Sequence, residues 1–326
     1  MTNITPLHFC AGIGPDNISP NRDKCIDLLL AHGAKLNHVT SRQDTALHWA
    51  TKLADYSVCE KLVKSGIDLK VLNVDSCTPA HGAAFYKRID VLELLIQNGV
   101  DVNAKDISGK NILHLLCKDQ TEELALVSSQ SEPNLTDETS LNILSIKKRY
   151  LSLITKLLTE FKMNPNEKDT SDFTPMMYAC EHNNLDLVKL LHQNGGDIHM
   201  SNKENVTCML LAVVNSCPSI VDYLIKNGFD VKGNTGPNIS YVTDAAYLND
   251  IEILNMLLDA GCDVNETKQD ENGVILNPLW ASLERTNISI VETLLNKGAN
   301  TIIRPDLNMT AVNFYRNLFF FFLRHY

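Results

Sequence analysis

The sequence predicts an all-α repeat fold of helix-turn-helix units joined by β-hairpin fingers, because two markers recur at one spacing. The first marker opens the first helix of each repeat, and most of its steps are 33 residues: Thr45, Thr78, Asn111, Thr174, Thr207 and Ser240. The second marker is the glycine that ends the second helix, and it keeps the same step: Gly33, Gly66, Gly99, then Gly195, Gly228 and Gly261. Two markers in a shared register indicate stacked structural repeats.

The repeat that runs from Thr78 to Asn103 shows why these residues favour helices. Pro79 suits the first turn of a helix, because the N–H that it lacks would have no partner there. Thr78 is the capping residue, and the loss of such a cap costs about 1 kcal/mol. Leu94 and Leu95 give the second helix an apolar stripe. The glycine that follows supplies the left-handed residue that ends the helix, and an extended hairpin arm comes next.

The spacing and the Thr-Pro-Leu-His sequence of Thr5 to His8 resemble the ankyrin repeat, and the resemblance covers nearly all of the 326 residues. It implies an all-α ankyrin-repeat solenoid, which we interpret as a single domain spanning residues 1–326. The expected repeats lie near 5–37, 40–72, 73–105, 106–168, 169–201, 202–234, 235–271 and 272–304, followed by an incomplete ninth repeat at 305–326.

The fourth repeat departs from the pattern because about thirty residues, near 118–147, are inserted between its helices. The insert is acidic and rich in hydroxyl groups at first and ends in the basic run Lys147 to Arg149. Its apolar residues Leu141, Leu144 and Ile146 are placed to extend the second helix backwards, and the remainder is expected to form a surface loop. The basic run fits a solvated helix face better than a nuclear-import signal.

Further departures from the repeat are expected near both ends and in the middle. In the first repeat the turn between the helices, Gly12 to Asp23, is long, and the second helix is placed at Cys25 to Ala31. In the fourth repeat Lys162 replaces the terminating glycine, so the stack is expected to be least regular there. The ninth repeat fails, and its aromatic end, Phe319 to Phe322, indicates an improvised cap, a truncated product or a longer protein.

Composition argues against several classes of protein. The net charge of −10 argues against a non-specific polyanion binder, whose surface would be basic, so nucleic acid is not an expected partner. The nine cysteines lack CxxC pairs, and several fill small-residue positions of the repeat, as core residues in a reducing compartment do. The N-terminus does not resemble a secretory signal, and no apolar run reaches membrane-spanning length. The expected location is the cytoplasm or the nucleus.

Four histidines, His8, His48, His81 and His114, are each the fourth residue of a box that opens a repeat. Because they recur with the repeat, we predict structural hydrogen bonds for them and not catalysis or metal binding. No hydrolase, kinase, nucleotide-binding or zinc-protease motif is present. We therefore predict no enzyme activity and no catalytic, cofactor-binding or metal-binding residues. The enzyme alternative would require His, Cys and acidic residues of different repeats to converge in one pocket.

The resemblance to ankyrin repeats implies that the fingertips and the exposed side of the first helices form a concave surface that faces a ligand. In this register the partner-binding candidates are Arg42, Asp44, Lys52, Asp75, Phe85, Tyr86, Lys110, Asp119, Phe173, Glu181, His182, Lys203, Glu204 and Tyr247. Cys77, Ser108 and Lys118 fall on the same surface. The aromatic candidates matter most, because aromatic side chains are enriched among interface hot spots. The alternative for each is packing on an adjacent finger or helix.

The leading functional hypothesis is a non-enzymatic intracellular scaffold or adaptor that binds a protein partner on this concave surface. It is expected to be monomeric, with the insert near 118–147 as a specificity or regulatory element. Stacked repeats provide a pre-ordered surface, so little chain entropy is lost on binding. The alternative is the substrate-recognition part of a ubiquitin ligase, or of another multidomain protein whose effector domain is absent from this chain.

Overall fold

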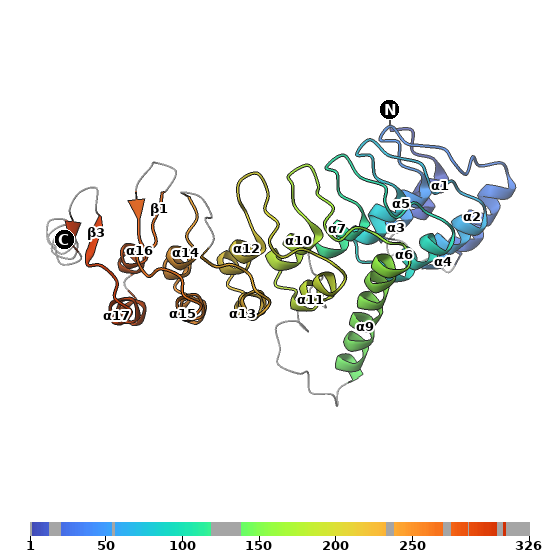
Figure 1. Cartoon of the computed structure of the whole chain (residues 1–326). Coiled ribbons are helices and arrows are strands. Elements are labelled where there is room, and N and C mark those ends of the chain that lie inside the picture. Colours follow the sequence, from blue (N-terminus) through green and yellow to red (C-terminus); the bar gives the residue numbers. More distant parts are fainter. Residues whose placement is uncertain are drawn as a thin grey trace. The chain divides into compact units, whose positions relative to one another are not determined.

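The chain folds into pairs of short helices joined by extended arms, with very little strand, as the sequence predicts (Figure 1). The computed structural model describes residues 2–12, 21–53, 56–118, 138–232, 238–269, 275–285, 287–304 and 309–310, and at 53, 138–143, 302–304 and 309–310 it describes the backbone alone. Contacts divide the chain into two compact units, Met1–Ala179 with Lys189–Gly196 and Cys180–Val188 with Asp197–Tyr326.

Each repeat contributes a first and a second helix. The first helices are α1 (Pro6–Ala11), α3 (Ala46–Leu53), α5 (Pro79–Phe85), α7 (Ile112–Cys117), α10 (Pro175–Glu181), α12 (Cys208–Val214), α14 (Tyr241–Leu248) and α16 (Pro278–Glu284). The second helices are α2 (Arg22–Ala31), α4 (Tyr56–Lys64), α6 (Ile89–Gln97), α9 (Glu138–Thr159), α11 (Leu185–Gln193), α13 (Pro218–Lys226), α15 (Ile251–Asp259) and α17 (Ile288–Asn296). Each first helix therefore begins directly after the first residue of its box, as predicted.

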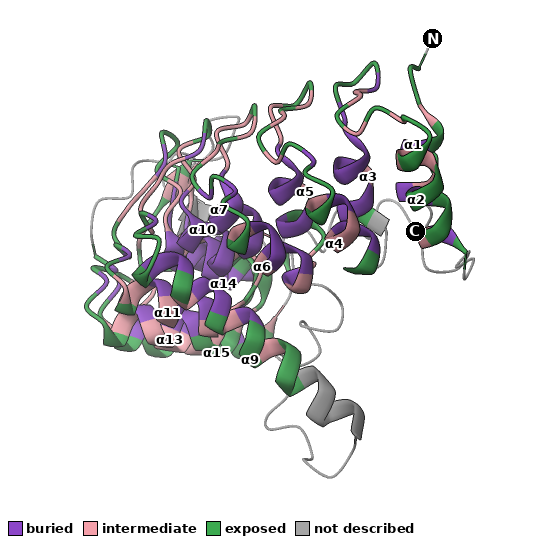
Figure 2. Cartoon of the chain, turned by 90° about the vertical axis from the view of Figure 1, so that its right-hand side faces the viewer, coloured by how far each residue is buried: buried purple, intermediate pink, exposed green. Residues whose placement is uncertain are grey.

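Helices of one kind pack beside each other within each unit. In the first unit, α1, α3, α5 and α7 form one layer, and α2, α4, α6 and α9 form a second. In the second unit, α12, α14 and α16 pack in sequence, and α13 packs beside α15. The core lies between the layers, where Leu92 and Leu95 of α6 and Ala83 and Ala84 of α5 are fully buried. Figure 2 shows α3 and α5 largely buried, while the fingers remain exposed or half-buried.

His48 shows how the box histidine joins one repeat to the next. Its Nδ1 accepts a hydrogen bond from the backbone N–H of Thr45 at 3.1 Å and lies 2.8 Å from the Thr45 hydroxyl. The ring proton is then on Nε2, which donates to the carbonyl of Cys77 in the next finger at 3.0 Å. His8 and His81 make the equivalent contacts. The predicted structural role of these histidines is confirmed.

One helix boundary differs from the prediction, and one extension is confirmed. Helix α2 begins at Arg22, before the predicted Cys25, because the acidic Asp23 stabilises the first turn through the helix dipole although the apolar pattern starts later. Helix α9 has 22 residues and begins at Glu138, so the apolar residues late in the insert do extend the second helix backwards. The earlier part of the insert, 119–137, and the aromatic tail lie outside the described residues.

Short strands occur in arms of the second unit. Strand β1 (Lys268–Gln269) pairs antiparallel with β2 (Ile275–Leu276), with Lys268 opposite Leu276 and Gln269 opposite Ile275. Strand β3 (Ile302–Arg304) pairs antiparallel with β4 (Met309–Thr310). An isolated antiparallel bridge joins Ser201 and Thr207. The extended arms therefore form hairpins at these positions.

Lys162 takes the place of the terminating glycine and adopts the left-handed backbone itself, with a φ of 54°. The equivalent glycines have φ between 82° and 92°, so the turn survives without its preferred residue. We expect Lys162→Gly to raise the free energy of unfolding by about 1 kcal/mol, because glycine lacks the Cβ that disfavours this conformation. Urea denaturation measures the effect. The control Lys156→Gly, inside α9, should lower stability by about 1 kcal/mol, and a loss of stability in Lys162→Gly would contradict the prediction.

Candidate functional site

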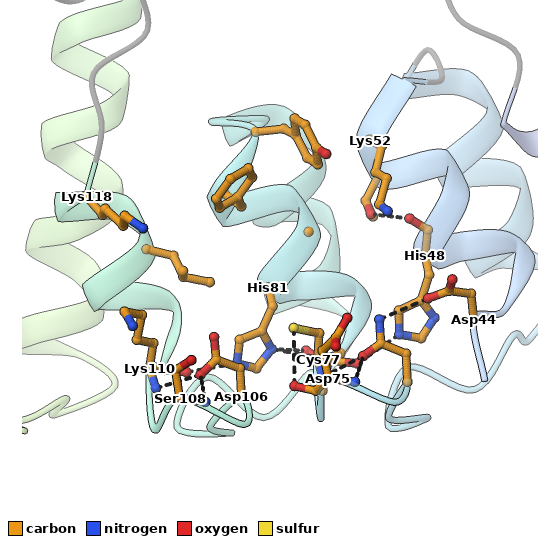
Figure 3. Close-up of a pocket in the computed structure, with 17 residues that line it drawn as sticks. Asp44, His48, Lys52, Asp75, Cys77, His81, Asp106, Ser108, Lys110 and Lys118 are labelled. Atoms are coloured by element: carbon orange, nitrogen blue, oxygen red, sulfur yellow. Dashed lines mark hydrogen bonds between the residues drawn. The ribbon is translucent and has the colours of Figure 1, made fainter. Parts of the chain in front are cut away.

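A groove in the first unit collects predicted contact residues from three successive repeats (Figure 3). It encloses about 310 Å³ and is lined by α3, α5, α7 and the fingers that precede α5 and α7. Six of the predicted partner-binding residues line it: Asp44, Lys52, Asp75, Phe85, Tyr86 and Lys110. Cys77, Ser108 and Lys118, assigned to the same surface, line it as well. Residues far apart in the sequence are thus brought to one place by the repeat register.

The fifth residue of the third box lines the groove and is glycine. The equivalent residues of the neighbouring repeats are Trp49 and Leu115. A Cβ at Gly82 would lie 2.5 Å from Oγ1 of Thr51, so α5 approaches α3 more closely than a larger residue permits. Thr51 is held in place because its hydroxyl donates to the carbonyl of His48 at 3.0 Å. This face of α5 therefore presents backbone where other repeats present a side chain.

The finger wall of the groove is shaped by carboxylate and amide oxygens that accept backbone hydrogen bonds. Oδ1 of Asp106 accepts from the N–H of Ser108 at 2.8 Å and from the N–H of Lys110 at 2.9 Å. The same position, five residues before the box, is occupied in other fingers by Thr40, Asn73, Asp169 and Asn202, each of which accepts two backbone hydrogen bonds. Side chains that bond their own backbone in this way fix tight turns.

Backbone hydrogen bonds link the fingertips of the first unit to one another. These bonds run from Ser41 N to Thr2 O at 3.0 Å, and at 2.9 Å from Val74 N to Arg42 O, from Ile107 N to Asp75 O and from Thr170 N to Ser108 O. The finger wall is therefore a continuous hydrogen-bonded edge and not a set of independent loops. Such a wall is already ordered before a ligand arrives.

Two charged groups of the finger wall form ion pairs within the molecule. The carboxylate of Asp106 instead accepts backbone N–H groups and has no cation partner among the described residues. Asp75 forms an ion pair with Arg42 at 2.7 Å, and Nζ of Lys110 lies 3.3 Å from the carboxylate of Asp169. The carboxylate of Asp44 is buried and accepts a hydrogen bond at 2.9 Å from an asparagine of the next finger. Asp44, Asp75 and Lys110 line the groove, and ion pairs compensate the charges of Asp75 and Lys110.

The helix wall carries exposed aromatic and basic side chains. Phe85 is 48% exposed and Tyr86 is 42% exposed, and their rings meet edge to face with centroids 5.1 Å apart. Lys52 and Lys118 lie on opposite sides of the helix that carries His81 (Figure 3). Among the described residues, neither lysine has a carboxylate partner. This wall therefore offers apolar area and positive charge to a ligand.

The histidine and cysteine side chains at the floor of the groove are uncharged at neutral pH. Burial lowers the pKa of His48 and of His81, so both rings are neutral and serve their structural hydrogen bonds. Burial, reinforced by nearby carboxylates, raises the pKa of Cys77 to about 11, so its sulfur stays a thiol. A thiol is a much weaker nucleophile than a thiolate. The described floor of the groove suits contact with a ligand better than covalent chemistry.

The remaining candidate residues of the first unit do not join the groove. Phe173 is half-buried and packs against Tyr178 of its own repeat, with ring centroids 5.3 Å apart. The hydroxyl of Tyr178 donates to Asp169 at 2.7 Å, which fixes this pair in place. Packing therefore accounts for Phe173. Asp119 lies outside the described residues.

The candidates of the second unit lie in separate places. Glu181 and His182 are half-buried neighbours, with Oε2 of Glu181 3.8 Å from Nε2 of His182. Lys203 and Glu204 are exposed at a fingertip, where the carboxylate of Glu204 accepts a hydrogen bond from Asn202 at 2.8 Å. No described cavity of the second unit includes these four candidates. They stay predictions of surface contact.

Tyr247 borders a second hollow, of about 490 Å³, in the second unit. The guanidinium of Arg285 lies 4.4 Å from the centre of its ring, a cation–π contact. Trp280 is buried and lines the same hollow. The part-buried Lys268 forms an ion pair with Asp244 there. Lys268 is therefore engaged with Asp244, and Arg285 with the ring of Tyr247.

Sequence reasoning missed two residues that shape the groove, although the sequence contains a signal for each. Gly82 is the smallest fifth residue in any of the eight boxes, so comparison across the repeats indicates a missing side chain there. Asp106 belongs to a position that carries Thr, Asn or Asp in five fingers, a composition typical of tight turns. Both signals depend on reading equivalent positions across repeats and not along one of them.

The described part of the chain gives two further findings. None of its helices combines the length and hydropathy needed to cross a bilayer. Within the same residues, no group of three or more His, Cys, Asp or Glu side chains is placed to hold a metal ion.

Helix pairs at a fixed period, joined by hairpin arms, define a repeat solenoid. A family model described as ankyrin repeats (3 copies) matches residues 2–73 and 141–235, and a model described as ankyrin repeat matches residues 75–107. The chain belongs to the ankyrin repeat family. Ankyrin repeats are protein–protein interaction modules, so the expected general class of function is confirmed.

Relatives with known names are mostly ankyrin repeat proteins. The ankyrin repeat protein FPV222 of fowlpox virus is 26% identical over 286 residues, which cover 84% of this chain and 38% of that protein. OPG189 of variola virus is 23% identical over 318 residues, which cover 89% and 54%. Palmitoyltransferase AKR1 of Lachancea kluyveri is 24% identical over 198 residues, which cover 58% and 27%. The chain spans from about a quarter to about half the length of these relatives.

Proposed function

We propose that this chain is a non-enzymatic scaffold or adaptor that binds a protein partner in the groove of the first unit. One observation carries the proposal: six residues predicted to face a partner converge from three successive repeats on one hollow. The exposed pair Phe85 and Tyr86 supplies the aromatic area that interface hot spots favour. The hydrogen-bonded fingertips keep the opposite wall in place, which lowers the entropy cost of binding.

The other parts of the proposal follow from the chemistry of the groove and the composition of the chain. The protonated thiol of Cys77 and the neutral ring of His48, already committed to structural bonds, favour a binding role over an enzymatic one. The net charge of −10 favours protein over nucleic acid as the partner. We place the protein in the cytoplasm or the nucleus, where it acts as a monomer.

We expect the double variant Phe85→Ala/Tyr86→Ala to weaken partner binding at least about thirtyfold, because each aromatic residue at a hot spot contributes 2 kcal/mol or more, roughly. Both side chains are exposed, so the fold should be unchanged. The measurement is affinity capture of partners by the full chain from cell extract, quantified by mass spectrometry. Far-UV circular dichroism confirms that the variant is folded.

A matched control exists within the same unit. Tyr56 is 39% exposed on α4 and Phe161 is 40% exposed just after α9, and neither lines the groove. The variant Tyr56→Ala/Phe161→Ala also removes one tyrosine and one phenylalanine side chain. It should still capture the same partners. Equal capture by both double variants would show that the groove is not the binding surface. Capture dominated by ubiquitin-ligase subunits would favour the alternative of a substrate-recognition component.

A further inference from the structure

The two walls of the groove differ in how their charges are used. On the finger wall, Asp75 is paired with Arg42, and Lys110 is paired with Asp169. The carboxylates of Asp44 and Asp106 have no cation partner among the described residues, but each is held by hydrogen bonds from neutral N–H groups. On the helix wall, Lys52 and Lys118 have no carboxylate partner among the described residues. The uncompensated charge of the helix wall is therefore positive, although the whole chain carries a net charge of −10.

The two lysines flank the apolar part of the groove. Lys52 lies on α3 and Lys118 directly follows α7, with α5 between these helices. Phe85 and Tyr86 stand at the end of α5, and Gly82 of the same helix also lines the groove. The order across the helix wall is therefore positive charge, aromatic pair and positive charge.

We propose that the groove selects an extended acidic peptide segment of its protein partner, in which two carboxylates flank one apolar anchor side chain. This inference rests on the proposed function and names the chemistry of the partner. The carboxylates pair with Lys52 and Lys118, and the anchor enters the hollow beside Gly82 against the aromatic pair. A charged ligand with this pattern compensates the two lysines, whereas a basic segment meets like charge on this wall.

Helix geometry sets the spacing of the two carboxylates. Neighbouring packed helices lie roughly 10 Å apart, so the two lysines are separated by roughly 20 Å across α5. An extended chain rises about 3.3 Å per residue, so the carboxylates are about six residues apart with the anchor near the middle. Salt screens charges beyond about 8 Å at physiological ionic strength, so acidic groups on distant parts of the molecule act only weakly on a ligand held at these two lysines.

The test is to pan a random library of twelve-residue peptides against the full folded chain at physiological salt. Enriched peptides should carry Leu or Phe between two Asp or Glu residues, at this spacing. In fluorescence anisotropy, Lys52→Glu and Lys118→Glu should each weaken the best peptide about five- to tenfold, as charge reversal at a partly exposed pair does. The neutral Lys118→Gln, which perturbs the chain end of α7 less, should weaken it about threefold.

Two controls separate the possible outcomes. Lys70→Glu reverses an exposed charge outside the groove and should leave affinity unchanged within about twofold. Ser108→Trp fills the groove from the finger wall without removing the backbone bonds of Ser108. If the affinity of the enriched peptides is unchanged in Ser108→Trp, the proposed function itself is overturned. Peptides that need the groove but lack acidic residues, or tolerate both lysine reversals, would overturn only this inference, and so would a library that yields no binder.

Discussion

His48→Ala is expected to lower the free energy of unfolding by about 3 kcal/mol, because it removes two structural hydrogen bonds and leaves a cavity. The backbone N–H of Thr45 and the carbonyl of Cys77 both lose their partner. Since these bonds join the first helix of one repeat to the next finger, the loss weakens an interface between repeats. Urea denaturation followed by circular dichroism measures it.

The control for this prediction is His32→Ala. His32 is exposed and contacts only the carbonyl of Leu28 in its own helix, among the hydrogen bonds found for the described residues. Its removal should change stability by no more than about 0.5 kcal/mol. A loss below about 1 kcal/mol in His48→Ala would show that the box histidine is replaceable and that packing alone joins the repeats.

The second large effect is acid destabilisation. In the folded protein, burial holds the pKa of His48 and of His81 below the ordinary value of 6.5. The unfolded chain takes up protons near pH 6.5, but the folded chain does not, so stability is complete above this pH and falls as the pH drops below it. Each ring contributes at most about 1.4 kcal/mol per pH unit, and the two together at most about 2.7. Urea midpoints between pH 7.5 and 5.5 measure this slope.

The double variant His48→Gln/His81→Gln isolates these two rings. Glutamine offers both a donor and an acceptor but does not titrate, so the hydrogen bonds can re-form while the proton uptake is lost. The slope of stability against pH should decrease accordingly. An unchanged slope in the double variant would assign the acid sensitivity to other groups.

Most of the fold was predictable because the residues that start and end the helices recur at equivalent positions of successive repeats. The helix starts after Thr78 and Thr174 follow from capping and from the proline in the first turn, and both are confirmed. The start of α2 was harder to predict, because Arg22 begins a polar first turn that the apolar pattern does not mark. Lys162 shows a related limit, since an unfavourable residue can still be held in the left-handed turn by its neighbours.

The candidate site was predictable in position but not in detail. The register placed Phe85 and Tyr86 on one surface with Lys110, and the groove contains all three. Which charges are already compensated depends on contacts between repeats, such as that of Lys110 with Asp169, and these contacts cannot be read along one repeat. The close approach of Gly82 to Thr51 of α3 is likewise a contact between repeats that one repeat alone does not reveal.

The hydroxyl of Thr170 donates to the carbonyl of Ser108 at 2.9 Å across 62 positions of sequence, whereas the fingertip bond at Val74 spans a single ordinary repeat. The sequence added between α7 and α9 is thus accommodated without interrupting the edge that borders the groove. We therefore expect the edge to tolerate a change in the length of the sequence between α7 and α9. The same stretch is also the natural place to insert a reporter domain into this protein.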